Sequence, residues 1–205
     1  MKITEVSLQK NNKDRANVYL DGEYVLSLDC VDAVVLGIKP GREISHSELE
    51  NLLMESQLGK ARSKAMDIIS RKPVTGFLLK QELIKKGYDE IVVDELVREL
   101  GELGILDDYA YTLLFVEMSA EKLWGRKKVE YELKQKGIDS NMLEDALCEI
   151  SLPGEEEICS AIAARYKGED LADARTKQRV VRFFASRGFD FSVIDRGINL
   201  YLKRN

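Results

Sequence analysis

The 205-residue sequence predicts a mainly α-helical protein, in which three tandem three-helix repeats form an elongated, curved body after a small antiparallel β module. Two observations indicate the repeats. A basic residue, a glycine, a large apolar residue and an aspartate recur at Lys86–Asp89, Lys136–Asp139 and Arg187–Asp190. Apolar residues at helical spacing flank every copy. A third observation, apolar residues on both sides of Asp21-Gly22, indicates the β module.

The N-terminal residues 1–45 predict an antiparallel sheet, which we expect to be a module separate from the helices that follow. Val18–Leu20 and Tyr24–Leu26 flank the Asp21-Gly22 turn, which is typical of a hairpin. A three-stranded sheet has little stability alone. We therefore expect it to pack on a short helix near Cys30–Leu36, and we expect a protein that begins near residue 46 to stay folded and helical.

Residues 46–60 predict a linking helix with Ser45 and Ser47 as candidate N-caps, while His46 has a capping or solvated role. The repeats that follow are repeat 1 (61–106), repeat 2 (107–152) and repeat 3 (153–205). Their first helices are expected at Ala61–Ser70, Asp108–Ala120 and Glu155–Tyr166.

The repeated turn has the chemistry of a helix end followed by a helix start. Glycine adopts the left-handed conformation that ends a helix, so we expect a positive φ, and aspartate can cap the next helix. Twelve residues before each glycine stand candidate N-caps of the second helix, Thr75, Gly125 and Thr176. The expected turn residues are Gly87, Gly137 and Gly188, followed by Asp89, Asp139 and Asp190.

Composition and motifs exclude several functional classes. Hydrophobic residues make up 44% and charged residues 33% of the chain, and no apolar run reaches the ~20 residues of a membrane span. Three cysteines without a CxxC and a single histidine argue against zinc, and no signal peptide is recognisable. We find no nucleotide-binding or catalytic motif. We expect no catalytic residues, cofactor, metal or membrane, and a reducing, cytoplasmic location.

The acidic pair Asp107-Asp108 and the single Trp124 each have two interpretations. The aspartates suggest metal ligands or a general acid and base, but no third ligand lies nearby in the sequence and helix capping explains at least one carboxylate. Trp124 either packs across the bend between two helices or anchors a partner beside Arg126–Lys128. We favour the structural interpretation in both cases.

Charge alternates along the repeats although the net charge is −5. The eleven residues before the turn glycines carry +2, +3 and +4, and the twelve from each capping aspartate carry −4, −4 and −1. Balanced, solvated helix faces explain any one of these signs. Their repetition favours a shared basic surface. The candidate binding residues are Lys80, Lys85, Arg126, Lys127, Lys128, Lys134, Lys177, Arg179 and Arg182.

Together the Lys/Arg-Gly turns, Gly104-Ile105-Leu106-Asp107-Asp108 and Gly125-x-x-x-Val129-x-x-Glu132-Leu133 resemble the RecX family of bacterial RecA regulators. The resemblance covers about residues 61–205, and the first 60 residues look like an extension that some members carry. Leu78 and Phe183 depart from the polar residues often found there in the family.

The resemblance implies a non-enzymatic regulator that binds the RecA–single-stranded DNA filament. Such a regulator restrains strand exchange, ATP hydrolysis and the stimulation of repressor self-cleavage, which places it in recombination, DNA repair and the SOS response. We expect a monomer whose partners are the RecA filament and single-stranded DNA within it.

Two alternatives stay open at this point. One is a helical-repeat adaptor that binds another protein and no DNA, although the ~50-residue period differs from the common adaptor repeats. The other is a direct DNA-binding protein built from helix-turn-helix-like units. Duplex DNA binding in the absence of RecA, and its dependence on salt, distinguishes them.

Overall fold

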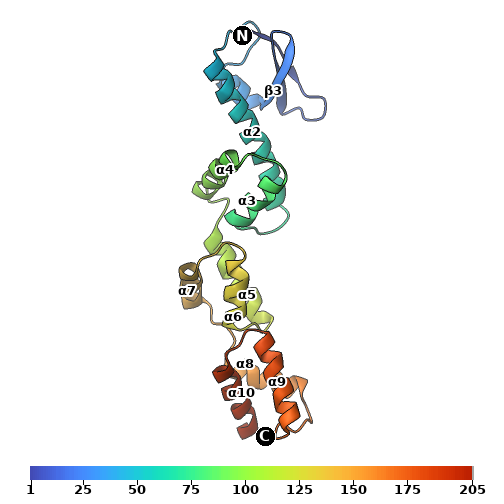
Figure 1. The fold of residues 1–205 in the computed structure, drawn as a ribbon, viewed down its shortest axis with the longest axis vertical. Coiled ribbons are helices and arrows are strands. Elements are labelled where there is room, and N and C mark those ends of the chain that lie inside the picture. Colours follow the sequence, from blue (N-terminus) through green and yellow to red (C-terminus); the bar gives the residue numbers. More distant parts are fainter. Residues whose placement is uncertain (205) are drawn as a thin grey trace. The chain divides into compact units, whose positions relative to one another are not determined.

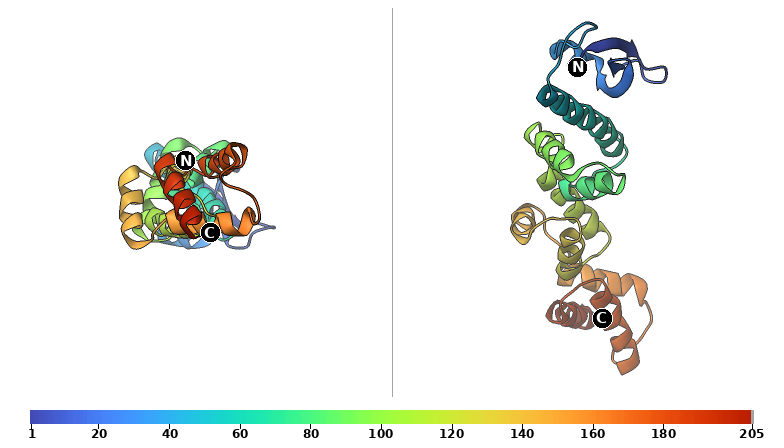
Figure 2. Two further views of the ribbon diagram at one scale, coloured as in Figure 1. Left: turned by 90° about the horizontal axis from the view of Figure 1, so that it is seen from below. Right: turned by 45° about the horizontal axis from the view of Figure 1, so that its top comes forward.

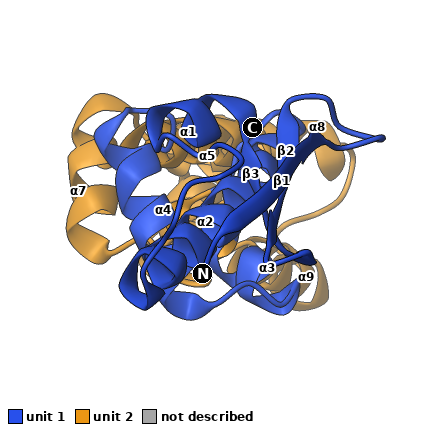
Figure 3. Ribbon diagram, turned by 90° about the horizontal axis from the view of Figure 1, so that it is seen from above, with its two compact units in different colours: residues 1–74, 79–106 blue, residues 75–78, 107–205 orange. Residues whose placement is uncertain are grey.

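The computed structural model describes residues 1–204, which form three strands and ten helices (Figure 1). The predicted mainly α-helical fold with an N-terminal antiparallel sheet is confirmed. The chain divides into two compact units (Figure 3). Unit 1 consists of residues 1–74 and 79–106, and unit 2 consists of residues 75–78 and the chain from 107 onward.

The sheet of unit 1 contains β1 (Ile3–Leu8), β2 (Arg15–Leu20) and β3 (Glu23–Asp29), paired antiparallel in chain order. Asp21 and Gly22 join β2 to β3 with φ angles of 48° and 94°. Two consecutive positive φ angles are typical of a type I′ turn, whose twist matches that of the flanking strands. The hairpin prediction is therefore confirmed.

The core under this sheet includes residues beyond position 45. Helices α1 (Cys30–Val35) and α2 (His46–Ile69) follow β3. Leu52 of α2 is buried with Ile3, Val18 and Leu28 of the sheet, so a boundary at residue 45 divides a continuous apolar core. Helix α2 also runs without a break through the expected linking helix and the first helix of repeat 1.

The buried Arg15 links α2 to the sheet, because its guanidinium donates to the Ser56 carbonyl of α2 at 3.4 Å. Arg15 is 5% exposed, and its guanidinium donates to both carboxylate oxygens of Asp29 at 3.3 Å and to the carbonyl oxygen of Ser27 at 2.8 Å. The Ser56 hydroxyl of α2 donates to the same Ser27 carbonyl at 2.6 Å. Because buried polar groups require partners, these bonds specify how α2 lies on β3.

Helix α2 begins with a capping box. The Ser45 hydroxyl accepts from the Glu48 backbone N–H at 3.2 Å, and the Glu48 carboxylate accepts from the Ser45 N–H at 2.8 Å. Of the two candidate caps, Ser45 is therefore the N-cap. Ser47 does not cap the helix, and its hydroxyl forms a hydrogen bond with the Ser45 hydroxyl. His46 is exposed and its Nε2 lies 3.6 Å from a Glu50 oxygen. The hydrogen bond from the Ser45 backbone lowers the pKa of Glu48 below its ordinary value.

Acid is expected to weaken this cap. Because the folded-state pKa of Glu48 is lowered, its hydrogen bonds stabilise the protein above the unfolded-state pKa of about 4.5, and the contribution is lost as the pH falls through the folded-state pKa. We expect Glu48→Gln to lower the melting temperature at neutral pH and to flatten its decrease on acidification. Thermal melts from neutral to acidic pH measure both. The same flattening in the control Glu5→Gln would contradict this assignment.

The remaining helices fall in chain order into the two units. Unit 1 contains α4 (Glu90–Glu102) and most of α3 (Gly76–Lys85). Unit 2 contains α5 (Asp108–Glu121), α6 (Arg126–Lys134), α7 (Ser140–Glu149), α8 (Glu155–Arg165), α9 (Ala174–Ser186) and α10 (Phe191–Arg204). Figure 2 shows α8 to α10 together at the C-terminal end.

The turn glycines adopt the expected conformation. Gly87, Gly137 and Gly188 have φ angles of 88°, 80° and 85°, which confirms the predicted positive φ. In each turn the residue after glycine donates its backbone N–H to the carbonyl four residues before the glycine, as in a Schellman cap. The apolar residues four and eight positions before each glycine are at most 1% exposed.

The helix caps after these turns differ in detail. Asp89 accepts from the Ile91 N–H at 2.8 Å, and Asp139 accepts from the Met142 N–H at 2.9 Å. The carboxylate of Asp190 instead forms an ion pair with Lys127. At the second helices, Thr75 caps α3 and Gly125 is the N-cap residue of α6.

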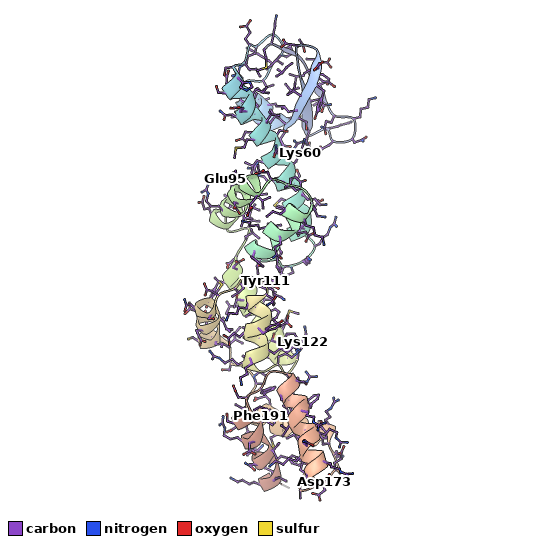
Figure 4. All side chains as sticks on the ribbon, viewed as in Figure 1. Lys60, Glu95, Tyr111, Lys122, Asp173 and Phe191 are labelled. Atoms are coloured by element: carbon purple, nitrogen blue, oxygen red, sulfur yellow. The ribbon has the colours of Figure 1, made fainter. Side chains whose placement is uncertain are left out.

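The expectation that Thr176 caps the second helix of repeat 3 is wrong. Asp173 is the N-cap of α9, and its carboxylate accepts from the Thr176 backbone N–H at 2.9 Å (Figure 4). Helix α9 therefore begins earlier relative to its turn glycine than α6 does, because the preceding loop supplies an aspartate, which is a better cap than threonine.

Two similar joints build unit 2. The Thr75 hydroxyl donates to the Lys136 carbonyl at 2.7 Å, and the Gly125 N–H donates to the Arg187 carbonyl at 2.8 Å. Thr75 and Gly125 occupy the same repeat position, as do Lys136 and Arg187. The turn of one repeat thus packs on the start of the second helix of the preceding repeat.

Asp107 and Asp108 both have structural roles. Asp107 caps α5 by accepting from the Ala110 N–H at 2.8 Å, and Asp108 accepts from the Gly76 N–H at 2.9 Å. These contacts support the structural interpretation of the pair.

Candidate nucleic-acid interface

Ion pairs between second and third helices neutralise three of the nine candidate binding residues. Lys80 Nζ lies 2.6 Å from Asp94 and 2.9 Å from Glu90, which raises its pKa through hydrogen bonds to Asp94 and then Glu90. In repeats 2 and 3 the acid at the position of Asp94 also pairs with a cation of the second helix, although one nearer its start, as Arg126–Glu144 and as Lys177–Asp195 at 3.7 Å. Asp94, Glu144 and Asp195 each stand seven residues after their turn glycine. Balanced helix faces therefore explain these three cations.

Two more candidates are also paired. Lys127 forms an ion pair with Asp190, and Arg179 forms one with Glu169. Arg179 also lies over the Tyr166 ring, with its guanidinium carbon 5.6 Å from the ring centroid. Exposed ion pairs of this kind contribute about 0–1 kcal/mol to the stability of a protein. A phosphate can therefore compete with the carboxylate for the cation.

Four candidates have no carboxylate within 4.0 Å among residues 1–204, namely Lys85, Lys128, Lys134 and Arg182. Lys85 lies in unit 1 and the other three lie in unit 2. Lys85 and Lys134 are exposed, so their ammonium groups are available to a ligand.

The α6 face combines Lys127, Lys128 and Lys134 with Tyr131, which the sequence analysis missed. Tyr131 is 63% exposed. Residues three and four apart are neighbours on a helix surface, so the ring lies between Lys127 and Lys128 on one side and Lys134 on the other. A charge count cannot detect this tyrosine, but its spacing from the lysines could have identified it.

Trp124 has a mainly structural role beside this face. Its ring meets that of Phe115 edge-on at 6.1 Å between centroids and packs against the core of repeat 2. Lys128 Nζ lies 4.3 Å from the Trp124 ring centroid, a cation–π contact that holds the lysine close to α6. The packing interpretation of Trp124 is confirmed.

The α9 face forms two adjoining hollows lined by arginines. Three arginines and one carboxylate line the first hollow, together with two aromatic rings: Arg165, Arg179, Arg182, Glu169, Tyr166 and Phe183. Arg179 and Arg182 also line the second, together with Arg175, Thr176 and Gln178. Arg165 and Arg175 lie outside the eleven residues before Gly188, so the charge pattern of the second helices does not include them. Arginine forks bind phosphate or carboxylate oxygens in pairs, so this face is suited to anions.

Other kinds of site are not found in the described part of the chain. Over residues 1–204, no three His, Cys, Asp or Glu side chains are grouped so that they could hold a metal ion. No helix in that range has the length and apolar character needed to cross a membrane. Cys30, Cys148 and Cys159 are free thiols.

The structure is that of a mainly helical protein with a small N-terminal sheet and with basic residues on α6 and α9. Family models match the regulatory protein RecX N-terminal domain over residues 1–45 and the second three-helix domain of RecX over residues 107–147. A regulatory protein RecX from Clostridium botulinum (strain Eklund 17B / Type B) is 31% identical over 198 residues, which cover 94% of this chain and 92% of the relative. The chain belongs to the RecX family of regulatory proteins.

Other similar proteins agree with this assignment. A regulatory protein RecX from Clostridium tetani is 27% identical over 205 residues, covering 98% of this chain and 94% of the relative. The crystal structure of a regulatory protein RecX matches with a TM-score of 0.75 and 24% identity, covering 97% of this chain and 98% of that one. RecX from Lactobacillus salivarius matches with a TM-score of 0.59 and 23% identity over 71% and 96% of the two chains. These structural likenesses concern the fold.

Proposed function

We propose that this protein is a non-enzymatic regulator that binds the RecA–single-stranded DNA filament and restrains its strand exchange, ATP hydrolysis and coprotease activities. It acts as a cytoplasmic monomer in recombination, DNA repair and the SOS response. Family membership supports the proposal. The observation that carries it is the set of exposed cations on α6 and α9 that remain outside the internal ion pairs.

The charge distribution suits a filament better than bare DNA. A net charge of −5 opposes indiscriminate coating of nucleic acid, whereas the α6 and α9 faces attract phosphates or acidic protein surfaces locally. A ligand that presents both DNA and protein engages these faces while the acidic third helices stay in water. Contacts that bind one state of the filament more tightly than another shift the filament toward that state. Restraint of its activities therefore requires that the protein bind a less active state more tightly.

Direct DNA binding is the second candidate function, and the arginine hollows on α9 favour it. Guanidinium groups from Arg165, Arg175 and Arg182 would bind duplex phosphates as well as those of a filament. Strong duplex binding in the absence of RecA would favour this candidate.

The cations without internal ion pairs are expected to dominate binding. Changing Lys134 and Arg182 together to alanine should weaken filament binding and reduce the slope of log K against log salt by about 1.4, since each lost phosphate contact to a single strand removes about 0.7. Co-sedimentation with preformed RecA filaments over a range of salt concentrations measures both quantities.

The matched control is Lys10→Ala with Lys13→Ala, which changes the net charge equally on the exposed loop before β2. This control should keep both the affinity and the slope. Equal losses in the two double variants would show that only net charge matters and that α6 and α9 form no site.

A further inference from the structure

We propose that the ring of Tyr131 stacks on one unpaired nucleobase. The flanking phosphates would be bound by Lys134 on one side of the ring and by Lys127 and Lys128 on the other. The α6 face would then select single-stranded over duplex nucleic acid. The inference rests on the proposed function and adds to it a contact to a base, at a residue that no charge count identifies.

The ring is free to receive a ligand. Tyr131 is 63% exposed, and within residues 1–204 its hydroxyl has no hydrogen bond and its ring has no aromatic or cation–π partner. The other rings of repeat 2 are partnered, since Phe115 packs between Tyr111 and Trp124. A large ring left in water at the centre of a basic helix face gains from being covered.

Its surroundings are cationic on both sides. Lys127 and Lys128 lie one helical turn before Tyr131 and Lys134 lies one turn after it. The nearby Glu132 pairs with Lys136, 3.6 Å away, so part of the local negative charge is balanced. The pair between Lys127 and Asp190 is exposed and therefore weak, so a phosphate can replace the carboxylate.

The shape of the ligand follows from the position of the ring. In a duplex both faces of each base are already stacked, and a ring on the convex surface of a helix cannot reach them. An unpaired base offers a free face, and stacking on aromatic side chains combined with lysine contacts to the backbone is the usual mode of single-strand binding. The equivalent residues of repeats 1 and 3 are Gln81 and Arg182, so repeat 2 alone supplies a ring at this repeat position.

The test compares the full-length protein with Tyr131→Ala and Tyr131→Phe in binding to three fluorescent probes at low salt. These are an oligothymidylate of about 20 nucleotides, an abasic strand with the same number of phosphates, and a duplex of the same length. Tyr131→Ala should weaken binding to oligothymidylate roughly fivefold or more, and it should leave the abasic strand and the duplex unchanged. Tyr131→Phe should bind like the wild type, because stacking needs only the ring. The control Tyr24→Ala removes another exposed tyrosine, in unit 1, and should have no effect.

Unchanged binding of Tyr131→Ala to oligothymidylate would overturn the inference. An equal loss on the abasic strand would also overturn it, because it would indicate a general binding defect and not a lost contact to a base. Failure of the wild type to bind any single strand would overturn it as well. The proposed function is tested separately, by inhibition of filament ATP hydrolysis with the same wild-type preparation. Failure of the Tyr131 inference can therefore be distinguished from failure of the proposed function.

Discussion

Replacing Gly188 with alanine is expected to destabilise unit 2 by roughly 2–4 kcal/mol. Its φ of 85° alone costs an L-residue about 1–2 kcal/mol. An added Cβ would also lie 2.3 Å from the Lys128 backbone nitrogen, so the turn of repeat 3 would have to move away from α6. Such movement strains the hydrogen bonds from Gly125 and Lys127 to this turn.

The other two turn glycines provide graded controls for this effect. A Cβ at Gly87 would meet nothing within 4 Å. Gly87→Ala should therefore cost only the about 1–2 kcal/mol that an L-residue loses in the left-handed conformation. At Gly137 the added Cβ would lie 2.3 Å from the Cβ of Phe77, which can move only with its backbone, so the cost should be well above that at Gly87. Urea unfolding followed by circular dichroism measures all three. Equal losses at Gly87 and Gly188 would show that the joint between repeats 2 and 3 is not close-packed.

Removing the carboxylate of Asp29 is expected to destabilise unit 1 by roughly 2–4 kcal/mol. The Arg15 side chain is 6% exposed, and Asp29 is its ion-pair partner. Asp29→Ala would leave a buried guanidinium with only neutral acceptors, the Ser27 carbonyl and hydroxyl and the Ser56 carbonyl. An unpaired buried charge is costly.

The double variant Asp29→Ala with Arg15→Met should recover part of this loss, because it removes the charge together with its partner. Glu23→Ala, which removes an exposed carboxylate from the same strand, is the control and should change stability by less than about 0.5 kcal/mol. Thermal and urea unfolding measure these differences. No recovery in the double variant would mean that the packing of the Arg15 side chain, rather than its charge, matters most.

Structural features that depend on local chemistry could be predicted from the sequence. The positive φ of the turn glycines, the capping by Asp89 and Asp139, and the hairpin at Asp21-Gly22 all follow from the preferences of single residues next to a clear hydrophobic period. The apolar residues at helical spacing four and eight positions before each turn glycine are buried. Local and global preferences agree at these positions, as a foldable sequence requires.

Features that depend on tertiary contact were not accessible from the sequence. The burial of Leu52 under the sheet extends the N-terminal core past residue 45, and only the packing of α2 reveals it. Pairing of Arg126 with Glu144 depends on which face α7 presents to α6. The cap of α9 depends on a loop whose course has no repeat equivalent, so Thr176 was assigned in place of Asp173.

The candidate interface was predicted in part for the same reason. The charge pattern predicted the basic second helices. It does not distinguish cations with an ion-pair partner from cations without one, and it does not include an uncharged ring such as Tyr131. It also missed Arg165, which reaches the α9 face from α8. Which side chains share a surface depends on the distances between helices. These distances cannot be derived from the composition of the sequence.

The central claim is that this protein regulates the RecA filament. Its most direct test is the rate of ATP hydrolysis by preformed RecA–single-stranded DNA filaments after addition of the purified protein. We expect the rate to fall with increasing protein, and to fall less with the Lys134→Ala, Arg182→Ala double variant than with the Lys10→Ala, Lys13→Ala control. An unchanged rate at protein concentrations that saturate the filament would contradict the proposed function.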